Sequence, residues 1–152
     1  MADYFVQFSC IFDVGSAENV LYAHGIVGDL PAHLDLDDYD DLGFQMEADP
    51  DSGAGALWLH AGPYGEPEHV IAFVLRCAET FNLTGLWGFC WALTCSKPRL
   101  DAFGGGAQLI DLGKRQSVAW VDCEHWLAQH LVDPADAAAA TTTGVADTGA
   151  DA

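Results

Sequence analysis

The chain has 152 residues, 51% of them hydrophobic, and it carries 23 acidic residues against 5 Lys and Arg, a formal net charge of -18. This charge repels phosphate groups, so direct binding to nucleic acid or to an anionic membrane is disfavoured and a basic protein surface is the favoured partner. The sequence has no apolar run of about twenty residues, so no membrane span is predicted. The odd number of cysteines, without a secretory signal, predicts a cytoplasmic protein with reduced thiols.

The N-terminal third predicts a strand followed by a helix. Apolar and polar residues alternate over residues 4–14, which predicts a strand with one buried face. Ser16 is a suitable N-cap for a helix that runs past His24. Gly25 weakens this helix, and Pro31 is expected to interrupt it or to start a second piece.

The middle of the chain predicts a hairpin and a second helix. Residues 42–47 and 54–61 have strand patterns, and the Pro- and Gly-containing stretch 49–53 between them has turn chemistry. Apolar residues at helical spacing follow Glu66, which lies next to a proline at the helix start. Asn82 is a suitable left-handed residue to end this helix.

The last third begins with an aromatic-rich strand at residues 86–95. Both of its faces are apolar, which predicts a central strand covered on both sides. Residues 107–112 and 116–121 predict a second hairpin, and Asp122 is expected to cap a final helix. Residues 133–152 are rich in Ala, Thr, Asp and Gly and are expected to be disordered.

This order of elements predicts an α+β domain over residues 1–132. Its plan is the ferredoxin-like split βαβ fold (βαββαβ), extended by a C-terminal β-hairpin and helix. The two helices are expected on one face of the sheet, and the other face would carry Trp87 or Trp91 together with Trp58 or Leu59. We expect this aromatic face to be covered by the final helix through Trp126 or by a second subunit in a homodimer.

Acidic residues predict the partner-binding surface. Five aspartates fall within seven residues, and their spacing lacks the glycine and the terminal glutamate of a calcium-binding loop. Residues 1–132 alone carry 5 - 19 = -14 charges, so the acidity belongs to the domain, either as a general solubility or halophilic trait or as a feature selected for a partner. The predicted partner-binding residues are Asp35, Asp37, Asp38, Asp40, Asp41, Glu47, Asp49 and Asp51.

Basic residues and glycines suggest an alternative site. Four of the five basic residues are Lys97, Arg99, Lys114 and Arg115, and a triple glycine lies between the two pairs. The glycines do not form a phosphate loop, because no Lys-Thr ending and no helix follow, and they are expected to allow a bend or a bulge. The bases either neutralise Asp101 and Asp111 or hold a small ligand, in a site formed by Lys97, Arg99, Gly104, Gly105, Gly106 and His60.

Catalytic and metal-binding signatures are weak. Cys90 and Cys95 have four residues between them, but no second ligand pair has a zinc-site spacing, and on a strand the two thiols point to opposite faces. No nucleophile elbow or comparable signature surrounds any Cys, Ser or His. We therefore predict no catalytic residue, no metal and no cofactor, and a binding protein in place of an enzyme.

The stretch LTGLWGF, followed by KPRLDAFGGGAQLIDL, resembles small proteins of bacterial genomes and mobile elements that have no assigned activity. The resemblance implies a bacterial or phage-borne protein and transfers no functional residue. The charge of the domain, the aspartates of residues 35–41 and the absence of a catalytic signature favour a nucleic-acid-mimicking inhibitor of a host defence nuclease, of the anti-CRISPR or anti-restriction type. A small-ligand-binding protein or enzyme and a dimerising structural domain are the alternatives.

Overall fold

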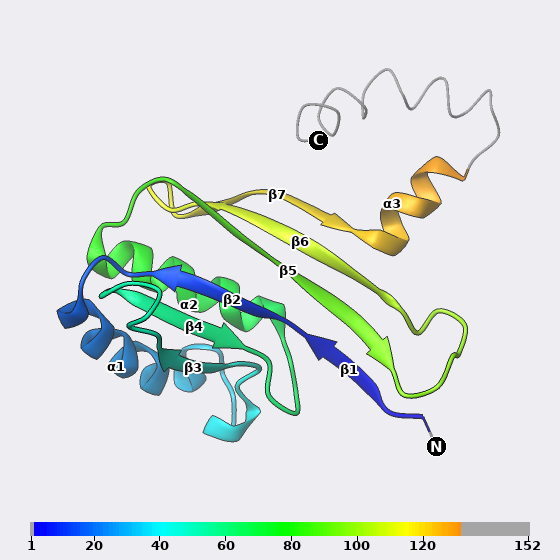
Figure 1. The fold of residues 1–152 in the computed structure, drawn as a ribbon, viewed down its shortest axis with the longest axis horizontal. Coiled ribbons are helices and arrows are strands. Elements are labelled where there is room, and N and C mark those ends of the chain that lie inside the picture. Colours follow the sequence, from blue (N-terminus) through cyan, green and yellow to red (C-terminus); the bar gives the residue numbers. More distant parts are fainter. Residues whose placement is uncertain (1, 132–152) are drawn as a thin grey trace.

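The structure, a computed structural model, describes residues 2–131 and has three α-helices, one 3-10 helix and seven strands in that range (Figure 1). The elements are β1 (Tyr4–Gln7), β2 (Ser9–Asp13), α1 (Ala17–His33), η1 (Tyr39–Asp41), β3 (Gln45–Ala48), β4 (Ala56–His60), α2 (Pro67–Phe81), β5 (Leu86–Cys95), β6 (Gly104–Asp111), β7 (Gln116–Asp122) and α3 (Cys123–His130). The predicted α+β class is confirmed. The predicted tail, residues 133–152, lies outside the described residues.

The strands form two antiparallel sheets, not the single sheet that was predicted. Sheet A has the order β1-β5-β6-β7 and sheet B has the order β2-β4-β3. The predicted first strand is divided at Phe8, so that β1 pairs with β5 and β2 pairs with β4. The strand order therefore does not confirm the ferredoxin-like topology.

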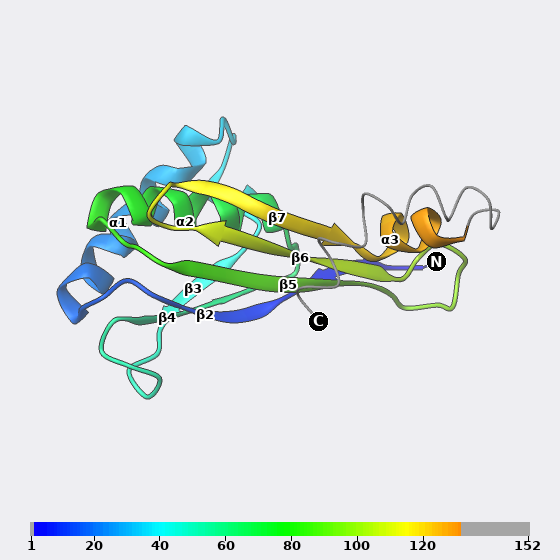
Figure 2. The same ribbon diagram turned by 90° about the horizontal axis from the view of Figure 1, so that it is seen from above.

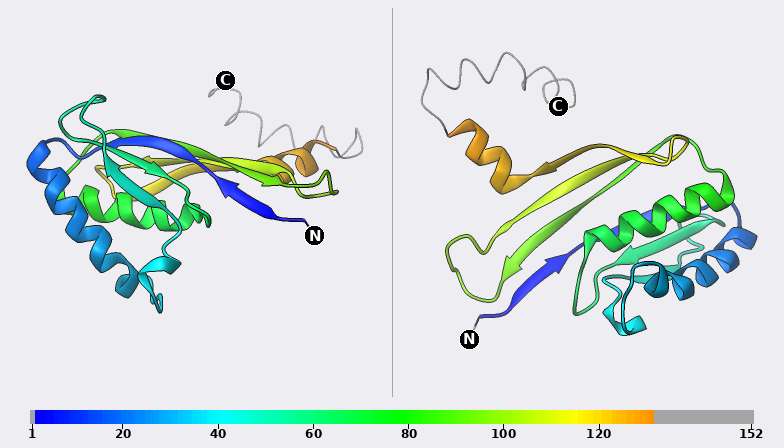
Figure 3. Two further views of the ribbon diagram at one scale, coloured as in Figure 1. Left: turned by 60° about the horizontal axis from the view of Figure 1, so that its bottom comes forward. Right: turned by 180° about the vertical axis from the view of Figure 1, so that it is seen from behind.

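Both long helices lie on the same side of the sheets, and the core lies beneath them (Figure 3). Phe12 and Phe73 are fully buried and meet edge to face, with ring centroids 6.3 Å apart. Phe44 packs on Phe73 at 5.4 Å from the N-terminal side of β3. Sheet B, α1 and α2 thus share one aromatic core, to which β5 and β6 add Phe89 and Ile110.

Helix α1 is longer than predicted, and Pro31 does not interrupt it. Ser16 caps its first turn as expected, accepting a hydrogen bond from the backbone N–H of Asn19 at 3.1 Å. The helix continues because Val27, Leu30 and Pro31 itself are buried against the core, and this packing outweighs the weak helix propensity of the sequence.

Helix α2 and the first hairpin were predicted well. The Glu66 side chain caps α2, Pro67 occupies its first turn, and Asn82 ends it with the expected left-handed backbone (φ 52°). Strands β3 and β4 pair as an antiparallel hairpin, and both begin two or three residues later than the sequence pattern suggested. The core side chains Leu57 and Leu59 of β4 are fully buried.

Strand β5 is covered on one face only, which corrects the prediction. Trp87 packs on the core, with its ring 5.2 Å from Phe12 and its indole N–H donating to the Ile11 carbonyl at 2.9 Å. The opposite face, which includes Leu86 and Cys90, is exposed. The prediction of an outward-facing Trp87 or Trp91 is therefore wrong, because both rings pack against the helix side of the sheet.

The β6–β7 turn lies beside α2, and the opposite end of sheet A extends past the helices together with α3 (Figure 2). Asp122 caps α3, accepting a hydrogen bond from the N–H of His125 at 2.8 Å, as predicted. No residue of α3 is buried, and Trp126 is 43% exposed, so α3 does not cover the sheet as predicted. Within the described residues no helix is both long and apolar enough to cross a membrane.

Candidate functional site

Charge divides the molecule into two regions. We call residues 9–81 the head, which contains sheet B, α1 and α2, and residues 86–131 the arm, which contains β5, β6, β7 and α3. The head has 14 acidic residues and one basic residue, Arg76, a net charge of 1 - 14 = -13. The arm has four of each, a net charge of 4 - 4 = 0. The field that steers a charged partner therefore comes from the head.

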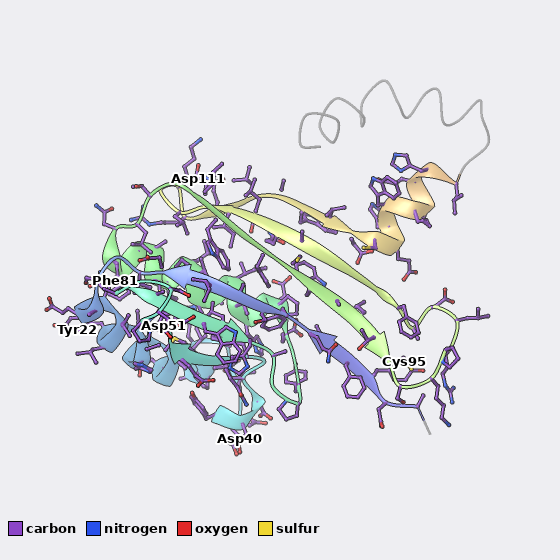
Figure 4. The ribbon with its side chains drawn as sticks, viewed as in Figure 1. Tyr22, Asp40, Asp51, Phe81, Cys95 and Asp111 are labelled. Carbon is purple, nitrogen blue, oxygen red and sulfur yellow. The ribbon has the colours of Figure 1, made fainter. Side chains whose placement is uncertain are left out.

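The acidic residues of the head surround the edge strand β3. Residues 35–41 precede it and Asp49 and Asp51 follow it, so the two groups lie at opposite ends of β3 (Figure 4). A four-residue strand spans ~13 Å, which sets the scale of their separation. Seven of the eight predicted residues are exposed and Asp49 is half-buried.

Local hydrogen bonds shape the acidic segments. Asp38 caps η1 by accepting a hydrogen bond from the Asp40 N–H at 3.3 Å, and Asp35 adopts a left-handed backbone at the end of α1. Asp49 accepts from the Ser52 hydroxyl at 2.8 Å in the β3–β4 turn. Glu47 contacts the His60 ring at 2.9 Å. Within residues 2–131 no carboxylate lies within 4.0 Å of a Lys or Arg nitrogen, so the head carboxylates are not neutralised by direct contact with Lys or Arg there.

The segment after η1 is fastened to the start of α2. The Gly43 N–H donates to His69 Nδ1 at 2.8 Å, and the Glu66 N–H donates to the Gly43 carbonyl at 2.8 Å. A Cβ at Gly43 would lie only 2.2 Å from the Glu66 Cβ, so this close approach requires glycine. These two hydrogen bonds hold η1 next to the loop that contains Tyr64.

A groove of about 260 Å³ lies between η1, β3 and this loop. Its lining combines aromatic, carboxylate, amide and apolar groups: Tyr39, Asp40, Leu42, Phe44, Gln45, Met46, Gly62, Pro63 and Tyr64. We call it the acidic groove. Partial desolvation, followed by the charge and hydrogen bond of Glu66 and the charge of Asp41, raises the pKa of Tyr64 above its ordinary value. Carboxylates from η1 and from the α2 cap thus both act on this tyrosine.

Sequence reasoning missed the two tyrosines and Glu66. Tyr39 is 55% exposed and Tyr64 is 51% exposed, although both are large aromatic residues. An aromatic residue inside the run of aspartates, and a second one in a Gly-Pro-Tyr-Gly loop, were the available signals. Their meeting depends on the contact between Gly43 and Glu66, which no local pattern encodes.

The residues of the predicted ligand site do not form one cluster. Lys97 and Arg99 are exposed in the β5–β6 connection, and Gly104 to Gly106 belong to β6, paired with Leu93, Ala92 and Trp91 of β5. His60 lies in sheet B, stacked on Trp58 at 3.9 Å between ring centroids. A second hollow, of about 370 Å³, lies near this end of sheet A between Phe5, Tyr64 and Asp101. Neither His60 nor Arg99 nor any of the three glycines lines it.

The four basic residues of the arm do not gather either. One pair precedes β6 and the other follows it, at the ends marked by Cys95 and Asp111 in Figure 4. The prediction that they neutralise Asp101 and Asp111 is wrong for direct ion pairs, because none is present there. Asp111 instead accepts a hydrogen bond from the backbone N–H of Lys114 at 3.0 Å, which closes the β6–β7 turn.

The five cysteines are free thiols. Burial, and secondarily the nearby Cys90, raises the pKa of Cys10 to about 12, and burial raises the pKa of Cys77 to about 12. Both thiols therefore stay protonated at neutral pH and are poor nucleophiles and poor metal ligands. In the described part of the chain no three His, Cys, Asp or Glu side chains converge as a metal site would require.

Comparisons of the chain with protein families, with curated proteins and with solved structures find no match. The resemblance to small proteins of bacterial genomes and mobile elements, which would cover most of residues 4–130, stays a prediction.

Proposed function

We propose that this protein is a binding module whose acidic head docks on a basic surface of another protein. The observation that carries the proposal is the division of charge, -13 in the head and 0 in the arm. A uniformly acidic solubility trait would spread over both regions. Like charges gathered on one region and left without Lys or Arg partners attract a cationic surface and orient its approach.

The acidic groove gives this partner a defined anchor. A Lys or Arg side chain placed between Tyr39 and Tyr64 gains contact with two aromatic rings, and its charged end meets the Asp40 carboxylate. Cation–π contacts contribute ~0.5–2 kcal/mol each, depending on how far they are removed from water. Arginine fits best, because its planar guanidinium stacks on aromatic rings and bonds carboxylates in pairs.

A nucleic-acid-binding protein is the class of partner that we propose. Its surface displays Lys and Arg in rows that follow a phosphate backbone, and the carboxylates before and after β3 offer two groups of negative charge to such a row. Occupation of that surface would exclude nucleic acid from it. Inhibition of a bacterial defence nuclease is one instance, and the free thiols fit a reducing, cytoplasmic location.

We also propose that the fold is a ferredoxin-like plan with a divided first strand. If β1 and β2 are counted as one strand broken at Phe8, the order along the chain becomes strand, helix, two strands, helix and strand, followed by β6 and β7. The pairing then runs β3-β4-β2/β1-β5-β6-β7 with every neighbour antiparallel. The division allows the arm to extend past the helices.

A fluorescein-labelled nona-arginine peptide tests the function. Fluorescence anisotropy should show binding that weakens as salt is raised, because the attraction is between exposed charges. The variant with Asp37, Asp38, Asp40 and Asp41 all changed to Asn should bind at least ~10-fold more weakly. A matched control removes four carboxylates outside the head by changing Asp133, Asp136, Asp147 and Asp151 to Asn, and it should lose about threefold or less.

The same peptide tests the groove separately. Tyr39→Ala should weaken binding by ~3- to 10-fold without changing the net charge, and Tyr22→Ala, an exposed tyrosine of α1, should have no effect. Equal weakening by the aspartate variant and its matched control would show that the acidity is a general trait and would remove the proposed function.

A further inference from the structure

Strand β7 is an open edge of sheet A. Within the described residues it pairs with β6 alone, and every residue from Gln116 to Val121 is exposed. The exposed fractions are 54% for Val118, 63% for Trp120 and 41% for Val121. The unpaired N–H and C=O groups of such an edge are a template for another strand.

The usual protection of a sheet edge is largely missing from β7. Monomeric proteins protect long edges with charged residues, prolines, bulges or a covering helix. β7 has no charged residue before Asp122 and no proline, and its one protective irregularity is a bulge at Val118, which has no partner on β6 between Ser117 and Ala119. Helix α3 follows at the end of β7 and adds exposed Trp126 and Leu127 to the same region.

We propose that β7 pairs antiparallel with β7 of a second copy of this chain, about a two-fold axis near Ala119. The two four-stranded sheets then join into one sheet of eight strands. This axis brings the exposed Val118 and Trp120 of both copies to the junction between the two sheets, where each copy can remove apolar area of the other from water. Two-fold symmetric dimers are the commonest assemblies of identical chains.

Charge selects this surface among the possible contacts between copies. Two heads repel each other, because each has a net charge of -13, whereas two arms meet with a net charge of 0 on each side. The antiparallel arrangement also brings the turn containing Lys114 of one copy toward Glu124 of the other. The pair occurs twice, once on each side of the axis.

The C-terminal residues of the same chain are a poorer occupant of this edge. Residues 132–152 contain four aspartates and no basic residue, and Val132 and Val145 are their only apolar residues larger than alanine, apart from Pro134. They offer little apolar area to Val118 and Trp120. A second copy offers the same exposed side chains that need cover.

Sedimentation equilibrium of the full chain tests the dimer. The monomer mass is 16.2 kDa, so a dimer has 2 × 16.2 = 32.4 kDa. We expect a dimer at micromolar concentration, and dimerisation should strengthen as salt is raised, because salt screens the repulsion between the acidic heads. Trp120→Lys should weaken dimerisation by at least ~10-fold. Tyr22→Lys, at an exposed site on α1, should leave the dimer unchanged.

Charge reversal provides a second test that does not depend on the folding of one variant. Lys114→Glu and Glu124→Lys should each weaken the dimer about fivefold. The double variant, in which the pair is restored with reversed signs, should return to within about twofold of the original affinity. A chain that sediments at 16.2 kDa at all concentrations, or a dimer that folded Trp120→Lys leaves intact, overturns the proposal.

Discussion

The head and the arm differ in which side chains they bury and in the net charge that they expose. Phe12 and Phe73 in the head are fully buried, whereas Trp120 and Val118 in the arm are more than half exposed. The head buries phenylalanines in its core and presents its charge beside two exposed tyrosines, and the arm presents apolar residues with no net charge. Partner binding and self-association can therefore occupy separate surfaces of one small chain, and variants at each region should separate them.

The largest difference should appear when apolar side chains are truncated. Phe73→Ala should lower the free energy of unfolding by ~3–5 kcal/mol, because it leaves a cavity between Phe12 and Phe44. Leu86→Ala on the open face of β5 should cost less than ~0.5 kcal/mol. Urea unfolding measures both, and equal losses would contradict the division into a packed head and an open arm.

Alkaline pH should destabilise the head through Cys77. Its pKa in the folded chain is about 12 against a model-peptide value of 9.0, so the unfolded chain releases the proton first as pH rises. The stability is intact below pH 9, and ~2–4 kcal/mol of it is lost as pH rises toward 12. Urea unfolding across this range should show a shallower loss for Cys77→Ala. Cys123→Ala, at an exposed arm position, should keep the full loss.

Replacement of two glycines by alanine should change the free energy of unfolding in opposite directions. Gly105 of β6 has φ 151°, and a Cβ there would lie 2.3 Å from the Trp91 carbonyl oxygen, so Gly105→Ala should cost ~1–3 kcal/mol. Gly25 of α1 has nothing within 4 Å of its Cβ direction, so Gly25→Ala should stabilise by ~0.5–1 kcal/mol. Thermal unfolding gives both values, and a stabilised Gly105→Ala would contradict the tight packing of β5 on β6.

The smallest effect belongs to the Glu47–His60 contact on sheet B. The Glu47 side chain is 59% exposed, so Glu47→Gln should change the stability by less than ~1 kcal/mol. The same variant should weaken nona-arginine binding by about twofold or less, because one charge of fourteen in the head is removed. A larger loss of binding would place the partner over β3 and not at η1.

Local sequence patterns predicted most elements of this fold. The Ser16, Asn82 and Asp122 caps all occupy the positions that their chemistry favours. The failures came from tertiary packing: buried Val27 and Leu30 carry α1 through Pro31, and the break at Phe8 divides one strand between two sheets. Apolar residues on both faces of β5 predicted a strand covered on both sides, because a sequence pattern does not distinguish a buried apolar face from an exposed one.

The sequence predicted which acidic residues are exposed at the candidate site, but it did not predict which other side chains lie beside them. The exposed aspartates follow from their density along residues 35–41, since charged residues at that spacing have no room in a core. Tyr39 and Tyr64 line one groove because the segment at Gly43 lies against the start of α2. The basic residues of the arm lie close in sequence but at the two ends of an eight-residue strand, so their clustering in the sequence did not predict clustering in space.

The most direct test is a map of amide chemical shifts upon titration with nona-arginine. We predict that the shifts concentrate in residues 35–51 and 62–66 of the head and leave β6, β7 and α3 of the arm unchanged. Shifts that spread evenly over the surface, or that concentrate in the arm, would contradict the assignment of partner binding to the acidic head.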